Sequence, residues 1–328
     1  MVMTEKTILV VGGAGYIGSH TCLALANKGY VPLVYDNFSG GHEEFVKWGP
    51  AEQGDIRDRA RLREVLAKHK PVAALHFAGL IEVGQSFQEP EAFYDVNVVG
   101  SLTLLQALME ADIRAFVFSS TCATYGRPER LPLDETHPQN PINPYGRTKH
   151  IVEQALRDFD LCDRMRSVML RYFNAAGADF EGRIGEWHTP ETHAIPLAIE
   201  VALGRRPHFS IFGEDYDTRD GTCIRDYIHV NDLADAHVRA VEYLLNGGET
   251  VDINLGTGTG TTVKELISAI ESVSGRPMPV VKTERRAGDP PMLVAGNGKA
   301  ENVLGWKPKH DINDIIRSAW NWHSRFNG

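Results

Sequence analysis

The sequence lacks most signs of a secreted, metal-binding or membrane-spanning protein. Only 4 of its 328 residues are cysteines, and no Cys-x-x-Cys pair occurs, which favours reduced thiols in a cytoplasmic protein over a disulfide framework. The 13 histidines form no His-Glu-x-x-His motif, so we expect no metal. We see no apolar run near the ~20 residues of a spanning helix, and no signal peptide before the first strand pattern.

Positive charge is also scarce. The formal net charge of -9 argues against nucleic acid or an anionic membrane as a partner. An anionic small substrate remains compatible with this charge, because a few nearby arginines outweigh distant charges that salt screens.

Strand and helix patterns alternate through the first half of the chain. The expected strands are 7–11, 31–35, 72–77, 115–118 and 167–172, and the expected helices are 16–28, 58–68, 90–111 and 144–161. This alternation predicts an α/β fold, a doubly wound parallel sheet of the Rossmann type. The pattern loosens afterwards, so we expect a cofactor domain at 1–175, a return to it around 227–255, and a smaller α/β substrate-binding domain at 176–328.

A glycine-rich turn joins the first strand to the first helix. Gly12, Gly15 and Gly18 have the spacing that lets a chain turn tightly, admit a pyrophosphate and pack helix on strand. Asp36 ends the second strand, near the ~20-residue offset of an acid that binds ribose hydroxyls. A carboxylate there repels a 2′-phosphate and favours NAD over NADP, with a simple strand-end cap as the alternative. The similar Gly256–Gly260 cluster is interpreted as a structural turn.

Tyr145 and Lys149 are spaced i, i+4 at the start of a predicted helix and therefore share one face. A phenol has a pKa of about 10, and an ammonium about 4 Å away supplies roughly the 4 kcal/mol needed to bring that pKa near neutrality. Ser119, Ser120 and Thr121 follow the fourth strand, at the sheet edge where such folds bind ligands. The pattern predicts acid–base chemistry beside a dinucleotide.

Together these motifs resemble the extended short-chain dehydrogenase/reductase family, and within it the 4-epimerases of UDP-galactose and UDP-glucose. The segments that carry the likeness are Asp36-Asn37, Gly54-Asp55-Ile56, His76-Phe77-Ala78-Gly79, Asn97-Val98-Val99-Gly100, Pro144-Tyr145-Gly146, Leu170-Arg171-Tyr172-Phe173-Asn174, Ile211-Phe212-Gly213-Glu214-Asp215-Tyr216 and Arg225-Asp226-Tyr227-Ile228-His229-Val230. The resemblance spans nearly the whole chain. It implies transient oxidation of the sugar C4 by bound NAD, rotation of the 4-keto sugar and hydride return to the opposite face.

The resemblance also implies site residues. Those for NAD are Gly12, Gly15, Tyr16, Ile17, Gly18, Asp36, Asn37, Asp55, Ile56, Phe77, Ala78, Gly79, Asn97, Ser119, Tyr145, Lys149 and Tyr172. Those for the UDP-sugar are Thr121, Tyr145, Asn174, His193, Arg225, Arg286, Asp289 and Leu293. Tyr145, Lys149 and Thr121 are the implied catalytic residues, and a homodimer through helices 90–111 and 144–161 is implied as well.

Three positions depart from the family pattern. Ile81 stands where a cofactor-contacting lysine is usual, His193 stands near an asparagine position, and Leu293 replaces a bulkier residue that excludes N-acetyl groups. UDP-GlcNAc or UDP-glucuronate 4-epimerase and a non-catalytic NAD-binding protein therefore remain alternatives. A 4,6-dehydratase or decarboxylase is disfavoured, because Thr121 is followed by Cys122-Ala123 and not by an acid. The sequence leaves open whether the pathway is catabolic or supplies polysaccharide synthesis.

Overall fold

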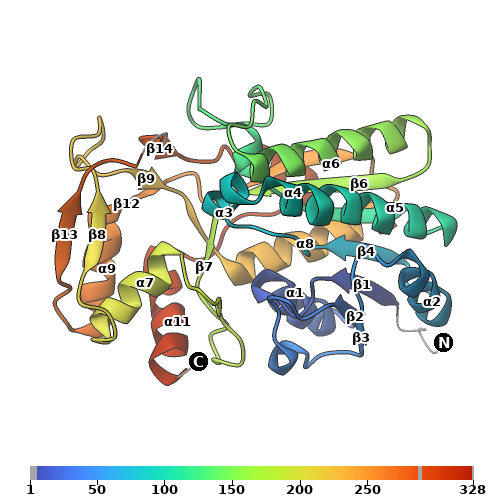
Figure 1. Ribbon diagram of the computed structural model, residues 1–328, viewed down its shortest axis with the longest axis horizontal. Coiled ribbons are helices and arrows are strands. Elements are labelled where there is room, and N and C mark those ends of the chain that lie inside the picture. The colour runs from blue at the N-terminus through green and yellow to red at the C-terminus, as the bar shows by residue number, and fades with distance from the viewer. Residues whose placement is uncertain (1–5, 287–289, 327–328) are drawn as a thin grey trace.

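The computed structural model describes residues 6–286 and 290–326 (Figure 1). The strands are β1 (Thr7–Val11), β2 (Val31–Asp36), β3 (Ala51–Gln53), β4 (Ala73–His76), β5 (Ala115–Thr121), β6 (Arg166–Tyr172), β7 (Asn174–Ala176), β8 (Phe209–Phe212), β9 (Ile224–Arg225), β10 (Tyr227–His229), β11 (Val251–Leu255), β12 (Thr261–Thr262), β13 (Val280–Thr283) and β14 (Met292–Leu293). The helices are α1 (Tyr16–Asn27), α2 (Arg59–His69), α3 (Val83–Gln88), α4 (Pro90–Phe93), α5 (Ser101–Glu110), α6 (Pro144–Leu161), α7 (Ala194–Ala202), α8 (Val230–Leu245), α9 (Val263–Ser274), α10 (Gly298–Leu304) and α11 (Ile312–Arg325), with short helices η1 (Glu43–Phe45), η2 (Tyr94–Gly100) and η3 (Cys122–Thr124).

A seven-stranded sheet forms the larger part of the molecule, in the order β11-β6-β5-β4-β1-β2-β3. All of its strand pairs are parallel, which confirms the predicted doubly wound α/β fold. Because side chains alternate along a strand, Ile8 and Val10 join the core under α1, α8 and α10. Leu9 and Val11 join the core under α2, α5 and α6 on the opposite face.

A second, smaller unit lies at the left of Figure 1 and is built on α7, α9 and α11. Its core includes Ile211 of β8, which pairs with β13 in a separate two-stranded sheet. Between the segments of this unit the chain returns to the large sheet, where β11 is an edge strand beside β6 and α8 packs against α1. We propose on this basis the division at about residue 175 with a return at 227–255.

The predicted helix at 90–111 is three consecutive helical segments, α4, the π-helical η2 and α5. Contrary to the expectation from sequence, this run from Pro90 to Glu110 is long and apolar enough by length and composition to cross a membrane. That test is also passed by core helices. Leu104, Leu105 and Leu108 of α5 are fully buried against the sheet, so packing within the fold accounts for the apolar character.

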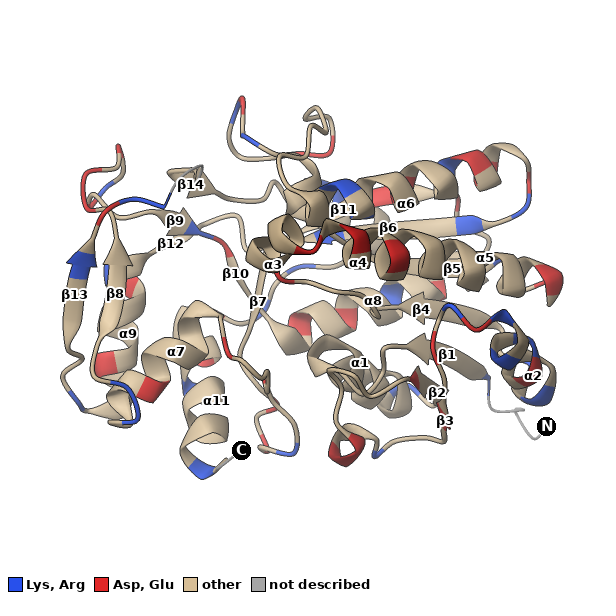
Figure 2. Ribbon diagram, viewed as in Figure 1, with Lys and Arg blue, Asp and Glu red and all other residues tan. Residues whose placement is uncertain are grey.

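Charges on α2 are largely compensated by neighbours, as the interleaved blue and red segments there show (Figure 2). Arg61 and Lys68 of α2 pair with Glu52 of β3 at 2.5 and 2.7 Å. Glu52 thereby joins the outermost strand to the helix that follows it, a contact that no sequence motif indicated.

Candidate active site

The glycine-rich turn between β1 and α1 fits a dinucleotide pyrophosphate. Gly12 has φ +80°, and a Cβ there would lie 2.5 Å from the Ala78 amide nitrogen. A Cβ on Gly18 would lie 2.2 Å from the Gly12 carbonyl oxygen. Gly15 is different, because its nearest neighbour would be 3.5 Å away. The first and third glycines are thus required by backbone packing, whereas the second leaves space above a helix N-terminus that has no side-chain cap and presents free N–H groups.

Several residues expected to touch the cofactor also secure this turn or the core. The Tyr16 hydroxyl donates a 2.6 Å hydrogen bond to the Gly177 carbonyl, and burial raises the pKa of that phenol well above its usual value. Ile17 packs against the core under α1. Ile56 and Ala78 pack in the opposite core. Contacts of these side chains with NAD remain predictions.

Asp36 lies at the end of β2, and its carboxylate reaches the glycine turn. It accepts hydrogen bonds from the amides of Ala14 at 3.0 Å and Phe38 at 2.9 Å. Next to it, the Asn37 side-chain amide donates to the Asp55 carboxylate at 3.1 Å. The strand-end cap that the sequence left as an alternative is therefore one role of Asp36, and ribose binding would be a second one.

The segment after β4 is fixed to the catalytic helix by Asn97. The Asn97 amide bonds the Leu80 backbone N–H and carbonyl at 2.8 and 2.9 Å, and it donates to the Thr148 hydroxyl at 3.2 Å. Gly79 lies under this amide with φ +156°, where a Cβ would be 2.8 Å from the Asn97 oxygen. Phe77 packs on a buried histidine ring of α8. Asn97 thus positions the loop, whatever contact it makes with NAD.

Tyr145 and Lys149 occupy the first turns of α6 and are buried. Asn143 caps this helix by accepting from the Gly146 amide at 2.7 Å, and Pro144 begins it. The Thr121 hydroxyl, at the end of β5, is near enough to the Tyr145 phenol to lower its pKa. The structure therefore brings together the three predicted catalytic residues at the carboxyl edge of the sheet.

The Lys149 ammonium is bound to the backbone beside Tyr145, and its effect on the phenol stays a prediction. Its Nζ donates to the Ser119 carbonyl at 3.1 Å, while the Ser119 hydroxyl bonds the Tyr172 phenol at 2.7 Å. Burial raises the pKa of Tyr145 above its usual value, and the nearby Thr121 hydroxyl opposes that rise. Burial also lowers the pKa of Lys149 to about 8. Burial is the largest cause of the rise in the Tyr145 pKa, so ionising the phenol needs positive charge from a bound cofactor.

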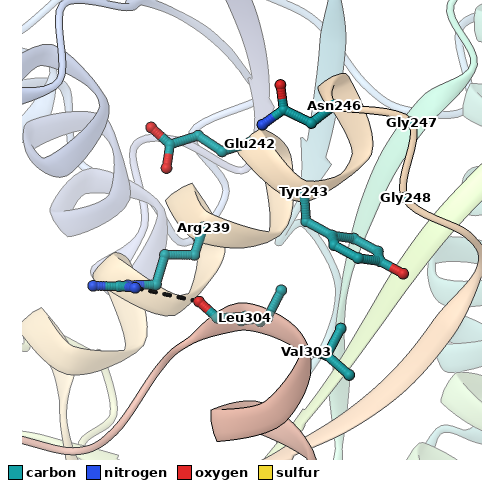
Figure 3. Close-up of a pocket in the computed structure, with 8 residues that line it drawn as sticks. All are labelled: Arg239, Glu242, Tyr243, Asn246, Gly247, Gly248, Val303 and Leu304. Atoms are coloured by element: carbon teal, nitrogen blue, oxygen red, sulfur yellow. Dashed lines mark hydrogen bonds between the residues drawn. The ribbon is translucent and has the colours of Figure 1, made fainter.

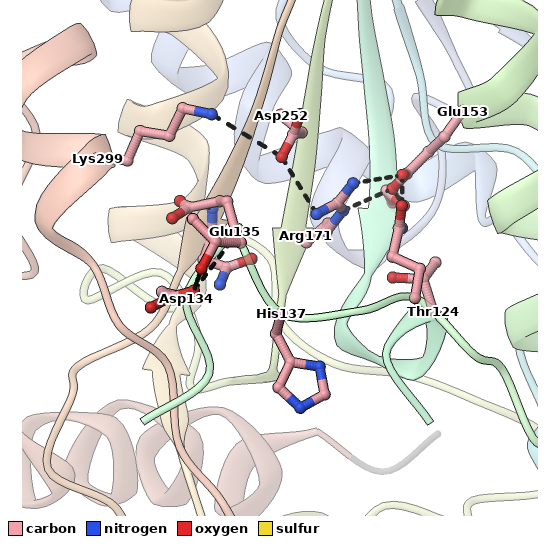
Figure 4. Close-up of polar contacts among 12 residues, drawn as sticks. Thr124, Asp134, Glu135, His137, Glu153, Arg171, Asp252 and Lys299 are labelled. Atoms are coloured by element: carbon pink, nitrogen blue, oxygen red, sulfur yellow. Dashed lines mark hydrogen bonds and ion pairs between the residues drawn. The ribbon is translucent and has the colours of Figure 1, made fainter. Parts of the chain in front are cut away.

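A buried ion pair behind the site holds α6 against the sheet (Figure 4). Glu153 is one turn beyond Lys149, and its carboxylate binds the Arg171 guanidinium of β6 at 2.6 and 2.9 Å. It also accepts from Ser120 of β5 at 2.6 Å. Arg171 reaches Asp252 of β11 at 3.2 Å. Because Glu153 and Arg171 are 0% and 1% exposed, this network fixes where the catalytic helix lies on three strands.

The residues expected to bind the UDP-sugar, apart from Thr121 and Tyr145, lie in β7 and in the segments that follow it in the chain. Asn174 and His193 line one small hollow together with Tyr227 and Glu186. Leu293 of β14 pairs with Arg225 of β9. Its side chain packs against the cluster of Tyr125 and Phe173, as does Cys122 of η3.

Arg286 and Asp289 follow β13. The Arg286 guanidinium stacks over the Phe212 ring at 3.9 Å, which orients a fork-shaped donor. Asp289 lies outside the described residues. Arg225 donates to the Ile224 carbonyl at 2.7 Å.

One group of residues was missed at the level of sequence. The structure gathers Glu186, His188, Glu191 and His193 so that one ligand atom of each lies within 4.8 Å of the others. Only His193 was expected to have a role, and no metal was expected. The repeated Glu-x-His spacing was the signal available, but only the folded loop places the two pairs face to face.

A separate hollow lies between the end of α8 and α10 (Figure 3). Arg239, Glu242, Tyr243 and Val303 are among its lining residues. None of the predicted site residues lines it, so it is not part of the candidate active site.

Known proteins share both the sequence and the fold. The family model described as GDP-mannose 4,6 dehydratase matches residues 9–319. A UDP-glucose 4-epimerase of Rhizobium leguminosarum bv. trifolii is 72% identical over 325 residues, covering 99% of each chain. A UDP-glucose 4-epimerase from Brucella ovis, solved in complex with NAD, is 50% identical with a TM-score of 0.95, covering 97% of this chain and 99% of that chain.

A UDP-glucose 4-epimerase from Bifidobacterium longum, solved with NAD+ and UDP, is 38% identical with a TM-score of 0.92, and 98% of each chain is covered. Identity at this level over nearly the full length, together with the glycine turn and the Tyr145–Lys149 pair in place, means that the chain belongs to the UDP-glucose 4-epimerase family of the extended short-chain dehydrogenases/reductases.

Proposed function

We propose that this protein interconverts UDP-galactose and UDP-glucose by inverting C4 of the sugar, using bound NAD. The observation that carries the proposal is the grouping of Thr121, Tyr145 and Lys149 at the carboxyl edge of the sheet, next to the glycine turn. NAD would supply a hydride acceptor that returns the same hydride, so the reaction has no net redox change.

Tyr145 would take the proton from the sugar 4-hydroxyl and return it after inversion. Thr121 lies beside the phenol and lowers its pKa, and its hydroxyl would share the reacting oxygen. Lys149, held by the Ser119 carbonyl, would bind the nicotinamide ribose and keep a positive charge near the phenol. Because burial raises the pKa of Tyr145, the phenolate would form only when the cationic cofactor is present, which couples proton removal to cofactor binding.

The UDP moiety would be held by Asn174, His193, Arg225 and Arg286. Guanidinium groups suit a diphosphate because they donate two parallel charge-assisted hydrogen bonds. The sugar must turn over between the two half-reactions, so firm contacts belong on the nucleotide and diphosphate and not on the sugar ring. Asp289 completes the proposed set.

Leu293 would set the width of the sugar pocket. It packs against the cluster of Tyr125 and Phe173, and so does Cys122, which is the residue that follows Thr121. Leucine is smaller than the bulky residue that excludes N-acetyl groups, so we propose that UDP-GlcNAc and UDP-GalNAc are also accepted.

We further propose a cytoplasmic homodimer formed through the helices at 90–111 (α4, η2 and α5) and 144–161 (α6). Phe87 of α3 and Val99 of η2 are 62% and 52% exposed, and a second copy would cover them. Light scattering of the purified protein tests this, since a monomer mass would refute the dimer.

The Tyr145→Phe variant tests the catalytic assignment. We expect it to fold and to bind NAD as the wild type does, because only the phenolic oxygen is removed, while turnover of UDP-galactose falls by at least about 10²-fold. Tyr243→Phe, in the separate hollow of Figure 3, is the matched control and should keep full turnover. Full turnover in the Tyr145 variant would overturn the assignment.

A further inference from the structure

The loop between β7 and α7 carries two histidines and two glutamates that face one another. Glu186 and His188 lie in the loop, Glu191 follows, and His193 is the residue that precedes α7. The His193 Nδ1 is 3.1 Å from a Glu186 oxygen and 2.9 Å from a Glu191 oxygen. The His188 Nδ1 is 3.4 and 3.6 Å from the same two carboxylates.

These spacings suit a tetrahedral cation. Zinc binds histidine nitrogen and carboxylate oxygen at about 2.0–2.1 Å, so neighbouring ligand atoms of a tetrahedral site lie roughly 3.3–3.5 Å apart. The four nitrogen–oxygen distances run from 2.9 to 3.6 Å. The full set of four ligand atoms spans up to 4.8 Å, so a small side-chain rotation completes the tetrahedron when the ion binds. The His188 Nδ1 is moreover buried without a hydrogen-bond partner, although its two nearest carboxylate oxygens are at 3.4 and 3.6 Å. A small ion between the three groups would satisfy that nitrogen.

The surrounding structure holds the carboxylates in place. The Glu191 Oε1 accepts from the amides of Thr192 and His193, both at 2.8 Å, and the Trp322 indole donates to the Glu186 carbonyl at 3.0 Å. Such outer contacts orient metal ligands. The Trp187 ring also stacks on a histidine of the segment after β2 at 3.6 Å, so the loop is anchored on both sides of Glu186.

Charge favours a cation as well. Glu186 is 4% exposed at its side chain and Glu191 is 12% exposed. Within the part of the chain that the structure describes, their ion-pair partners are His188 and His193. Two carboxylates are balanced by two imidazolium ions or, when both imidazoles are neutral, by one dication. A metal would therefore replace two protons, and imidazole with carboxylate in a tetrahedral set is suited to zinc.

We propose that Glu186, His188, Glu191 and His193 form a binding site for one divalent transition-metal ion of the zinc class. Glu186 and His193 also line the hollow beside Asn174, and the His188 ring lies 6.3 Å from the Tyr16 ring of the glycine turn. The ion would have a structural role, linking the loop to the start of α7 next to the proposed nucleotide sites. With Nδ1 on the metal, the Nε2 of His193 stays free for a substrate.

The test uses untagged protein loaded with NAD, so that no affinity-tag histidines bind metal. After chelator treatment and desalting, Zn²⁺ is titrated by calorimetry, and Co²⁺ is added to a second sample for visible absorption. We expect one Zn²⁺ per chain and the intense visible bands of tetrahedral Co²⁺. His188→Gln and Glu186→Gln should lose both signals. His69→Gln, which removes another histidine paired with a glutamate, should keep both.

Metal binding is measured separately from turnover, so failure of this proposal and failure of the epimerase proposal are distinguishable. If the cluster variants do not fold, the Co²⁺ spectrum of the wild-type protein still shows whether a tetrahedral site is present. Absence of tetrahedral bands, or Zn²⁺ uptake by the cluster variants equal to that of His69→Gln, would show that the four side chains form an ion-pair network only and would overturn the site.

Discussion

Replacing Glu153 with glutamine should destabilise the protein and displace the catalytic helix. Glu153 is fully buried and binds Arg171 through two hydrogen bonds of 2.6 and 2.9 Å. Removing one partner of a buried ion pair typically costs about 3–5 kcal/mol, because the other charge stays buried. Arg171 keeps Asp252 at 3.2 Å, so we expect the lower end, about 3 kcal/mol. For a chain of this size that is a fall in Tm of roughly 6 °C.

The assay is thermal and urea unfolding with a matched surface control. Glu64→Gln removes a carboxylate that pairs with Arg61 on exposed α2, where Glu64 is 66% exposed, and it should cost less than about 1 kcal/mol. The double variant Glu153→Leu with Arg171→Met should recover much of the lost stability, since apolar replacement of a buried pair is often neutral. A Glu153→Gln protein as stable as Glu64→Gln would refute the reasoning.

The same pair predicts a pH dependence. Burial alone would raise the pKa of Glu153, but Arg171, Ser120 and a glutamine bring it below its usual value of 4.5. A carboxyl group with a depressed folded pKa contributes stability that is fully present above the unfolded pKa and is lost as pH falls through the folded one. The stability difference between wild type and Glu153→Gln should therefore be constant near pH 7 and shrink below about pH 4.5.

Four further variants probe the cofactor and sugar sites. Gly15→Ala should keep the wild-type Tm but bind NAD more weakly in a fluorescence titration. Gly18→Ala should lower Tm, because its Cβ would lie 2.2 Å from a carbonyl oxygen. Equal effects of the two variants would contradict the roles assigned to these glycines. Asp36→Asn should raise the NADP/NAD affinity ratio measured by calorimetry, since it removes the charge that repels a 2′-phosphate, and an unchanged ratio would count against ribose binding. Leu293→Tyr should abolish turnover of UDP-GlcNAc while sparing turnover of UDP-galactose. Unchanged UDP-GlcNAc turnover measured by NMR would contradict the proposal that Leu293 sets the width of the sugar pocket.

The sheet type and the position of the candidate active site could be predicted from sequence, because both depend on patterns within short stretches of chain. The β1–α1 turn, the cap and start of α6 and the Tyr145–Lys149 pair all follow from spacing that the structure reproduces. The alternation of strands and helices likewise follows from hydrophobic periodicity, and the seven-stranded sheet is parallel as predicted.

Properties that depend on distant residues could not be predicted in the same way. The direction of the Tyr145 pKa shift depends on burial by the whole fold, which the spacing of Tyr145 and Lys149 does not reveal. The hydrogen bond from the Ala14 amide to Asp36 depends on how closely β2 approaches the glycine turn. The Glu186–His193 cluster has no recognised spacing, and its ligand geometry exists only once the loop is anchored by Trp322. The π-helical η2 interrupts a run whose periodicity looks continuous.

The most direct test of the account is NMR of UDP-galactose deuterated at C4, mixed with purified protein and no added cofactor. In the proposed reaction the hydride leaves C4 for bound NAD and returns to C4. We therefore expect UDP-glucose that retains deuterium at C4. Deuterium lost to solvent, or no UDP-glucose even after NAD is added, would contradict it.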